Sequence, residues 1–227
     1  MYTLYIANKI YSSWSLRPWV LMQELGIPFT EKLVPFGAGS NWSTFRTFSP
    51  NGRVPCLHDG ELVIWDSLAI VEYLAEQHQG VWPADRAARA WARSATAEMH
   101  SGFEALRQQC SMHCGLRVQL REISPALQKD LDRLDELWNQ GLTRFGGNFL
   151  AGASFTAVDA FFAPVAFRVQ TYDLALSEPA LAYVHRLLSL PSLQNWQTTA
   201  RQEPWRDEIH EAEILQMGVA IADYRTN

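Results

Sequence analysis

The stretch Tyr-Ser-Ser-Trp-Ser-Leu-Arg-Pro, residues 11–18, lies between a strand-like run and an apolar helical pattern. The strand-like run covers residues 2–6, and the helical pattern continues over residues 19–25. Three serines therefore lie in one strand-to-helix turn, where serine hydroxyls cap backbone N–H groups. The positive end of the helix dipole lies at the same turn, and such a turn can hold an anion. Taken alone, the stretch indicates a capped helix, and the rest of the chain decides whether it also carries chemistry.

The region after this turn continues with a second strand. Gly26 ends the helix, and residues 29–34 alternate apolar and polar side chains in part. A helix between two strands favours a parallel strand pair. Residues 36–48, rich in Gly, Ser, Asn and Thr, indicate an irregular surface segment.

A hairpin follows around Asp59 and Gly60. This dipeptide between two apolar runs is a strong hairpin signal, so residues 56–58 and 62–65 are expected to be antiparallel neighbours. A helical pattern over residues 68–76 comes next. The order predicts a small mixed sheet with helices packed on it, an α/β first domain.

The pattern changes within residues 79–86, where we place a domain boundary: one domain over residues 1–80 and a second over residues 86–227. After residue 85 apolar side chains recur at three- and four-residue steps, which predicts an all-helical second domain. One helix is expected over residues 91–110. The others are expected over residues 127–142, from residue 156, over residues 179–190, over residues 191–201 and over residues 209–217.

Composition limits the class of protein. The chain has 227 residues, of which 48% are hydrophobic and 19% charged, values typical of a globular protein. A net charge of −5 argues against nucleic-acid and anionic-membrane partners, and no apolar run reaches the roughly eighteen residues of a membrane span. The first residues lack the pattern of a secretory signal. Three cysteines form no disulfide framework, so we expect a cytoplasmic protein.

Asp66 and Ser67 open the helix over residues 68–76 and have two interpretations. The first is a helix cap that needs no ligand. The second uses the same geometry for an α-amino-acid group: Asp66 accepts from an ammonium, while the Ser67 hydroxyl and the helix N–H groups donate to a carboxylate.

Arg53, Val54 and Pro55 precede the hairpin. The Val54–Pro55 bond is trans by default. If it is cis, the backbone N–H and C=O of Val54 turn outward from the sheet edge and can pair with an extended peptide. Arg53 is either a solvated surface charge or a ligand for a carboxylate.

Thr156 and Asp159 form a capping-box pattern, which we assign to folding. Cys110, His113 and Cys114 lie close together, but a closed zinc site needs four ligands and no matching pair occurs elsewhere, so we expect thiols of the core or of a cleft and no metal.

His100 and Arg107 lie on one edge of the helix expected over residues 91–110. If that edge faces the first domain, they line a cleft together with Met99 and Phe103. Otherwise they form an ordinary polar helix edge.

Together, these segments resemble the soluble glutathione S-transferases over nearly the whole chain. The resemblance rests on Ser-Ser-Trp-Ser-Leu-Arg at residues 12–17, Arg-Val-Pro at 53–55, Asp-Ser-Leu-Ala-Ile at 66–70 and the pair Thr156 and Asp159. The serine turn is most similar to that of the zeta class, Ser-Ser-Cys-x-x-Arg, with Trp14 in place of cysteine. Residues 98–107 are similar to those of bacterial members.

The resemblance implies a thioredoxin-like first domain, a helical second domain, a cytoplasmic homodimer that acts in detoxification, and a cis Pro55. It places the cysteinyl backbone of glutathione on Val54 and the γ-glutamyl end on Asp66 and Ser67. It places the sulfur beside Ser12, with Ser13 as the second candidate. The implied glutathione-binding residues are Ser12, Arg17, Arg53, Val54, Pro55, Asp66 and Ser67, and the implied electrophile cleft comprises Trp14, His100, Phe103 and Arg107.

The implied reaction adds the glutathione thiolate to a small electrophile. A free thiol has a pKa of about 8.5, so a Ser12 hydroxyl that donates to the sulfur increases the thiolate fraction. Three alternatives stay open: a glutathione-dependent cis–trans isomerase of the maleylacetoacetate type, a non-catalytic glutathione- or ligand-binding protein, and a thiol oxidoreductase. The last is disfavoured because the turn carries serines where a mixed disulfide needs a cysteine.

Overall fold

The computed structural model describes residues 1–226. Its first part is a four-stranded sheet with three helices: β1 (Tyr2–Ile6), α1 (Ser13–Glu24), β2 (Phe29–Leu33), α2 (Trp42–Phe45), β3 (Cys56–Asp59), β4 (Leu62–Ile64) and α3 (Ser67–Ala75). The strand order is β2-β1-β3-β4. Strand β1 pairs in parallel with β2 and antiparallel with β3, and β3 forms an antiparallel hairpin with β4. The predicted parallel pair and hairpin are confirmed.

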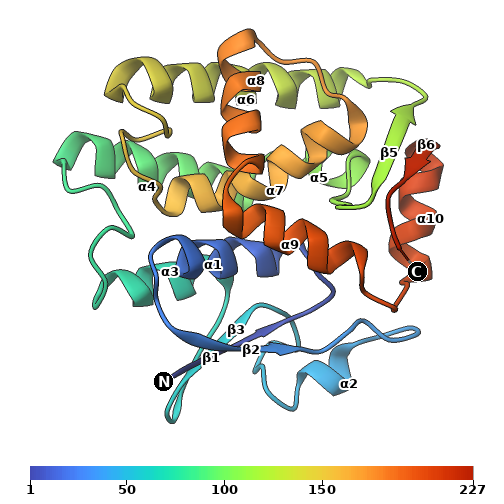
Figure 1. Cartoon of the computed structure of the whole chain (residues 1–227), viewed down its shortest axis with the longest axis horizontal. Coiled ribbons are helices and arrows are strands. Elements are labelled where there is room, and N and C mark those ends of the chain that lie inside the picture. Colours follow the sequence, from blue (N-terminus) through green and yellow to red (C-terminus); the bar gives the residue numbers. More distant parts are fainter. Residues whose placement is uncertain (227) are drawn as a thin grey trace.

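Helix α1 is the link between the sheet and the rest of the molecule. Figure 1 shows α1 and α3 between the sheet and the later helices. Every residue of α1 from Leu16 to Met22 is buried, because the helix packs on the sheet on one side and on α7 on the other. The serine turn at the start of α1 is therefore held between the two parts of the molecule.

The second part is helical, as predicted, and is organised around α7. Its helices are α4 (Arg86–Ser101), α5 (Glu104–Gln109), α6 (Pro125–Phe145), α7 (Ala157–Tyr172), α8 (Glu178–Leu188), α9 (Pro191–Arg201) and α10 (Glu208–Met217). Helix α7 is buried at every position except Gln170. A helix that is apolar almost all round lies in the core, and α7 contacts α1, α4 and α8.

The single helix expected over residues 91–110 is wrong. Helix α4 ends at Ser101 and α5 begins at Glu104, because Phe103 adopts a left-handed backbone conformation with φ of 52°. Phe103 is 6% exposed and packs edge-on against Phe162, so tertiary packing overrides the regular apolar spacing. His100 and Arg107, expected on one helix edge, therefore lie on different helices.

Two further local expectations need correction. The second part also contains a two-stranded antiparallel sheet, β5 (Leu116–Leu120) with β6 (Gly218–Asp223), whose strands are far apart in the sequence. The segment expected to be irregular, residues 36–48, contains the short helix α2, which buries Phe45. The β5–β6 pairing joins segments far apart in the sequence, which local patterns do not show, whereas the ring neighbours of Phe45 are the nearby Phe36 and Phe48.

The capping box at the start of α7 is confirmed. Asp159 accepts hydrogen bonds from the Thr156 N–H (2.9 Å), the Leu150 N–H (3.0 Å) and the Tyr183 hydroxyl (2.8 Å). Burial raises the pKa of Asp159 to about 6, and these donors oppose the rise. The assignment of this pair to folding agrees with its complete burial.

The change from sheet to helices falls between α3 and α4; the domain bounds 1–80 and 86–227 stay a prediction. Within residues 1–226, no helix combines the length and the apolar character needed to cross a membrane.

Candidate active site

A cleft of about 650 Å³ lies at the N-terminus of α1, between the two parts of the molecule. The first part contributes the serine turn, the segment before β3 and the loop around α2. The second part contributes α5, one side chain of α7 and two of α10. Apolar walls come from aromatic side chains and Met112, and polar groups converge at the serine turn.

Ser12 is the N-cap residue of α1, but its side chain forms no capping hydrogen bond. Instead its hydroxyl donates to the Ser15 hydroxyl at 2.7 Å, and the Ser15 oxygen also accepts from the Ala7 N–H at 3.3 Å. Serine hydroxyls rotate, so this pair can reverse its direction and leave the Ser12 proton facing another acceptor. Ser12 is 6% exposed and lines the cleft.

The Ser13 hydroxyl also lines the cleft and contacts a buried cation. Its oxygen accepts from Nη2 of Arg168 at 3.3 Å, while Nε of Arg168 donates to the Cys110 carbonyl at 2.8 Å. Because the Ser13 oxygen accepts from a guanidinium, its own proton is available to an acceptor in the cleft.

Two arginine side chains lie over the Trp14 ring. The guanidinium carbons of Arg17 and Arg107 lie 3.9 and 5.6 Å from the centroid of the ring, and the His100 ring lies edge-on at 5.4 Å. Arg17 is 1% exposed and does not line the cleft. Burial, followed by the charges of Arg168 and Arg107, lowers the pKa of Arg17 well below its usual value. Cation–π contact with Trp14 offsets part of the cost of burying this charge.

Asp66 and Ser67 lie beside this cluster. Asp66 caps α3, since its Oδ1 accepts from the Leu68 N–H at 3.0 Å, and its Oδ2 lies 3.2 Å from Nε2 of His100. Burial lowers the pKa of His100, Asp66 opposes this, and Arg17 adds to it. The contact is therefore a hydrogen bond from a neutral imidazole to a carboxylate. The Ser67 hydroxyl is buried and has no partner within residues 1–226.

The segment before β3 forms the other side of the cleft. The Val54–Pro55 peptide bond is cis, as the resemblance implies. Val54 and Arg53 line the cleft. Gly52, in a left-handed conformation with φ of 62°, lies under the Trp42 ring, where an added Cβ would meet a ring carbon at 2.5 Å. A glycine is needed here to let Trp42 cover this end of the cleft.

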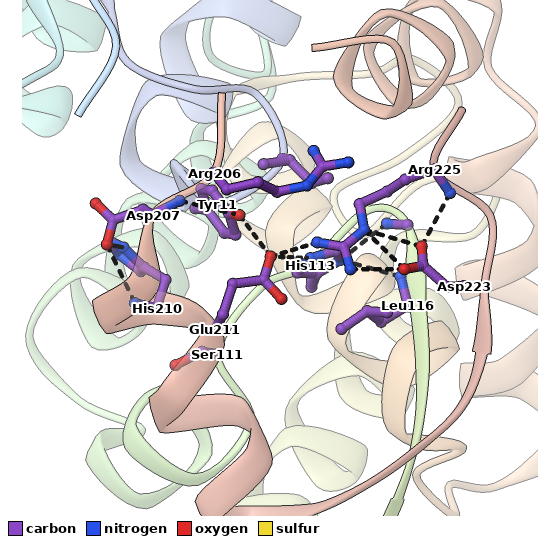
Figure 2. A network of polar contacts seen from close by, with 12 residues as sticks. Tyr11, Ser111, His113, Leu116, Arg206, Asp207, His210, Glu211, Asp223 and Arg225 are labelled. Carbon is purple, nitrogen blue, oxygen red and sulfur yellow. Dashed lines mark hydrogen bonds and ion pairs between the residues drawn. The ribbon is translucent and has the colours of Figure 1, made fainter. Parts of the chain in front are cut away.

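Tyr11, next to Ser12, has a hydroxyl that is already committed. Figure 2 shows it directed at Glu211 of α10, to which it donates at 2.5 Å. His113 and Arg225 contact the same carboxylate. Burial opposes ionisation of Glu211, but hydrogen bonds from His113 and Tyr11 and the charge of Arg225 lower its pKa to about 2. Tyr11 therefore supports the cleft wall, and its hydroxyl is not available to a ligand.

Cys110 and Cys114, whose thiols are expected in the core or in a cleft, lie in the core together with His113. Nδ1 of His113 accepts from the backbone N–H groups of Gly115 and Leu116, both at 3.0 Å. Burial raises the pKa of the Cys110 thiol to about 12. All three cysteines are buried, and none lines the cleft.

The structure brings together half of the residues expected at the site. Those that line the cleft are Ser12, Ser13, Trp14, Arg53, Val54 and Arg107. Those that lie behind or beside it are Arg17, Pro55, Asp66, Ser67, His100 and Phe103.

Several cleft residues were missed from the sequence. The most informative is Arg168, which lies in the middle of the apolar helix α7; an arginine in such a pattern is a usable signal for a buried charge. His210 and Glu213 of α10 also line the cleft. No local pattern predicts their position, because a tail nearly two hundred residues away folds back onto the serine turn.

Comparisons with known proteins agree on one family. The glutathione S-transferase N-terminal domain model matches residues 11–77, and the C-terminal domain model matches residues 89–208. The chain is 28% identical over 200 residues to glutathione S-transferase F14 of Arabidopsis thaliana, covering 81% of this chain and 73% of that protein. It is 27% identical to a zeta-class glutathione S-transferase of Euphorbia esula, covering 82% and 88%. A Burkholderia BGR1 glutathione transferase homolog with bound glutathione superposes with a TM-score of 0.64 at 25% identity, covering 88% and 97%.

Proposed function

Because this chain belongs to the glutathione S-transferase family, we propose that it is a glutathione transferase. It binds glutathione in the cleft, stabilises the thiolate of its cysteine with a serine hydroxyl and adds that thiolate to a small electrophile. The observation that carries the proposal is the serine turn: two hydroxyls line the cleft at the start of α1, and neither is used to cap the helix.

The chemistry of this turn suits a thiolate. The first N–H groups of a helix have no intrahelical acceptor and carry partial positive charge. Ser12 adds an O–H that Ser15 can support from behind, since Ser15 can donate to the Ser12 oxygen while Ser12 donates to sulfur. Ser12 keeps its proton and acts as an electrostatic stabiliser. Ser13, polarised by Arg168, is the second candidate.

The rest of glutathione is proposed to extend from the serine turn along the segment before β3. The backbone of Val54 pairs with the cysteinyl residue, and Arg53 lies at the same wall. The γ-glutamyl end binds Asp66 and the Ser67 hydroxyl, which has no partner within the described residues. Arg17 contributes through Trp14, on which it stacks, and Pro55 sets the direction of Val54. Bound glutathione in the Burkholderia homolog supports glutathione as the ligand.

The electrophile is proposed to occupy the wall formed by Trp14 and Arg107. His100 and Phe103 support this wall from behind: His100 packs edge-on against Trp14, and Phe103 sets the break between α4 and α5. These assignments place the substrate next to the sulfur site.

Glutathione-dependent cis–trans isomerisation is the second candidate. It uses the same thiolate in a reversible addition to a double bond, and 27% identity over 168 residues to a probable maleylacetoacetate isomerase of Vibrio cholerae favours it. Thiol–disulfide exchange through a protein cysteine has less support, because all three cysteines are buried and outside the cleft lining.

The proposal is tested by retention on immobilised glutathione together with turnover of a panel of a chloronitrobenzene, a maleyl compound and a disulfide. Wild type is expected to be retained and to turn over the aromatic halide. Turnover of the maleyl compound alone would favour the isomerase. Ser94→Ala, on the exposed side of α4, is the matched control and is expected to behave as wild type. Retention without any turnover would leave a binding protein and contradict the transferase.

We also propose a cytoplasmic homodimer. Large apolar side chains on and next to β4, Leu62 and Trp65, are 57% and 43% exposed, and contiguous exposed apolar surface marks protein–protein contacts. Sedimentation of the purified protein measures the assembly: a dimer mass is expected, and a monomer at micromolar concentration would contradict it.

A further inference from the structure

Three arginines surround the serine turn without a carboxylate partner. Arg17 and Arg168 are 1% and 4% exposed, and Arg107 is half-buried. None of the three takes part in an ion pair within residues 1–226. Buried charges are normally paired, so this cluster requires an explanation.

Arg168 is the best-positioned member of the cluster. It projects from α7 to the cleft, where Nη2 donates to the Ser13 hydroxyl and Nε is held by the Cys110 carbonyl. Nη1 has no hydrogen-bond partner among the described residues. A guanidinium stays protonated even in such surroundings. The α7 scaffold therefore holds a fixed cation beside the proposed sulfur site, and its Nη1 donor is buried without a partner among the described residues.

Arg107 approaches the cleft from α5. Its guanidinium carbon lies over the Trp14 ring at 5.6 Å, and its Nε has no partner among the described residues. Arg17 lies closer to the same ring, at 3.9 Å. Burial, followed by the charges of Arg168 and Arg107, lowers the pKa of Arg17 below its usual value.

The acidic groups near the cleft form no ion pair with these arginines within residues 1–226. Glu104 and Glu213 line the cleft but are exposed, and Glu104 accepts from its own helix neighbour Gln108. Asp66 acts on Arg17 electrostatically but forms no ion pair with it, and its oxygens contact His100 and the start of α3. The wall between Ser13 and Trp14 is therefore positive, although the chain carries a net charge of −5.

We propose that Arg107 and Arg168, together with the Ser13 hydroxyl, form a subsite that binds a carboxylate of the electrophile. The rest of the substrate then lies against Trp14, with its reacting carbon turned toward Ser12. This rests on the proposed glutathione transferase function and names its substrate class. Guanidinium groups match a planar carboxylate with two parallel hydrogen bonds. The positive wall therefore favours an anionic substrate over an uncharged one.

The test compares a chloronitrobenzoate with its uncharged carboxamide, each rate divided by the uncatalysed reaction with glutathione. Wild type is expected to prefer the carboxylate, and Arg107→Gln to reduce that preference about tenfold, the size of a charged hydrogen bond. Arg168→Gln is expected to reduce it further, and Arg168→Lys keeps the charge if the Gln variant does not fold. Arg144→Gln, an exposed arginine at the end of α6, is the matched control and is expected to leave the preference unchanged.

Two results would overturn the subsite. In the first, the Arg107 variant lowers turnover of both compounds equally. In the second, the KM of the Arg107 variant for glutathione rises by the same factor as the carboxylate preference falls, which would assign the arginines to binding glutathione or its thiolate.

Calorimetry with benzoate against benzamide gives a readout without turnover. Benzoate is expected to bind wild type and Arg144→Gln, and to lose binding in Arg107→Gln. If wild type turns over neither compound, the transferase proposal fails, while the benzoate result still decides the subsite. Absence of benzoate binding to wild type would contradict it.

Discussion

Helices α1 and α7 pack against each other, and both begin at a hydroxyl residue. Their N-termini are nevertheless used in different ways. At α7, Thr156 and Asp159 form a buried box in which the carboxylate accepts from donors of three segments. At α1, the Ser12 hydroxyl contacts only a second serine, and the Ser13 hydroxyl contacts the end of an arginine.

The difference shows that residue type does not separate a folding motif from a chemical one. Ser, Thr and Asp are preferred at both helix starts for the same reason, the unpaired N–H groups of the first turn. The two helix starts differ in whether the hydrogen-bonding capacity of their side chains is used by other groups of the protein. At α7 it is used completely, whereas at α1 two hydroxyls keep capacity for a ligand beside a cleft.

The largest expected effect comes from removing the capping carboxylate at the start of α7. Asp159→Ala leaves several buried donors unpaired and is expected to cost about 3 kcal/mol or more of unfolding free energy. At about 2–4 °C per kcal/mol, the melting temperature falls by about 6–12 °C. Urea unfolding followed by circular dichroism measures the loss. Turnover per folded molecule is expected to stay within about twofold of wild type, since removing this side chain takes nothing that touches the cleft.

Asp132→Ala, an exposed acid on α6, is the matched control for that experiment and is expected to change stability by no more than about 0.5 kcal/mol. Wild-type stability combined with lost turnover in the Asp159 variant would reverse the assignment of the two helix starts.

The next largest effect is expected at the start of α1, where turnover is expected to fall while stability changes little. Ser12→Ala removes a hydroxyl that caps nothing, so unfolding free energy is expected to change by no more than about 1 kcal/mol. Turnover is expected to fall about 10–100-fold, as when one donor to a developing anion is removed. Initial rates with an aromatic halide measure this. A stability loss as large as that of Asp159→Ala would place Ser12 among the folding residues.

A smaller effect concerns Tyr11, the hydroxyl next to the turn that is committed to Glu211. The folded pKa of Glu211 is about 2, below the unfolded value of about 4.3. The folded state therefore binds fewer protons, and the stabilisation is present above about pH 4.3 and is lost as pH falls toward 2. At neutral pH the unfolding free energy of wild type is expected to exceed that of Glu211→Gln by about 1–2 kcal/mol. Urea unfolding measured between neutral pH and about pH 2 should show this difference shrinking as the pH falls. A difference that grows on acidification would contradict the network.

The smallest expected effect comes from Ser15, which lies behind Ser12. Ser15→Ala leaves the Ser12 hydroxyl in place but removes its partner at 2.7 Å. Turnover is expected to fall about two- to fivefold, the size of one neutral hydrogen bond, with the KM for glutathione unchanged. Ser101→Ala, on the surface of α4, serves as the control. A larger loss from Ser15→Ala than from Ser12→Ala would make Ser15 the donor to sulfur.

Local signals were enough to predict most of the scaffold. The hairpin follows from Asp59 and Gly60, and the end of α6 follows from Gly146, because glycine at these positions allows conformations that other residues disfavour. The capping box of α7 was also readable, since its partners lie three residues apart. The break at Phe103 was not readable, because it is stabilised by packing against α7 and not by any turn residue.

The site was predicted less completely than the fold. The serine turn and the segment before β3 carry local motifs, and Ser12, Ser13, Trp14, Arg53 and Val54 of these motifs line the cleft. Arg168 and His210 lack such motifs and reach the cleft through tertiary structure, one from the core helix and the other from the tail. The positive wall could not be predicted from a chain with a net charge of −5, because it arises from three arginines brought together by folding.

The most direct test of the serine turn is the pKa of the glutathione thiol in the complex, measured by thiolate absorbance in wild type, Ser12→Ala and Ser13→Ala. In wild type the pKa is expected to lie well below the free value of about 8.5. In Ser12→Ala it is expected to rise by about one unit, equivalent to about 1.4 kcal/mol. A rise in Ser13→Ala alone would move the role to Ser13. An unchanged pKa in both variants would contradict the claim that this turn stabilises a thiolate.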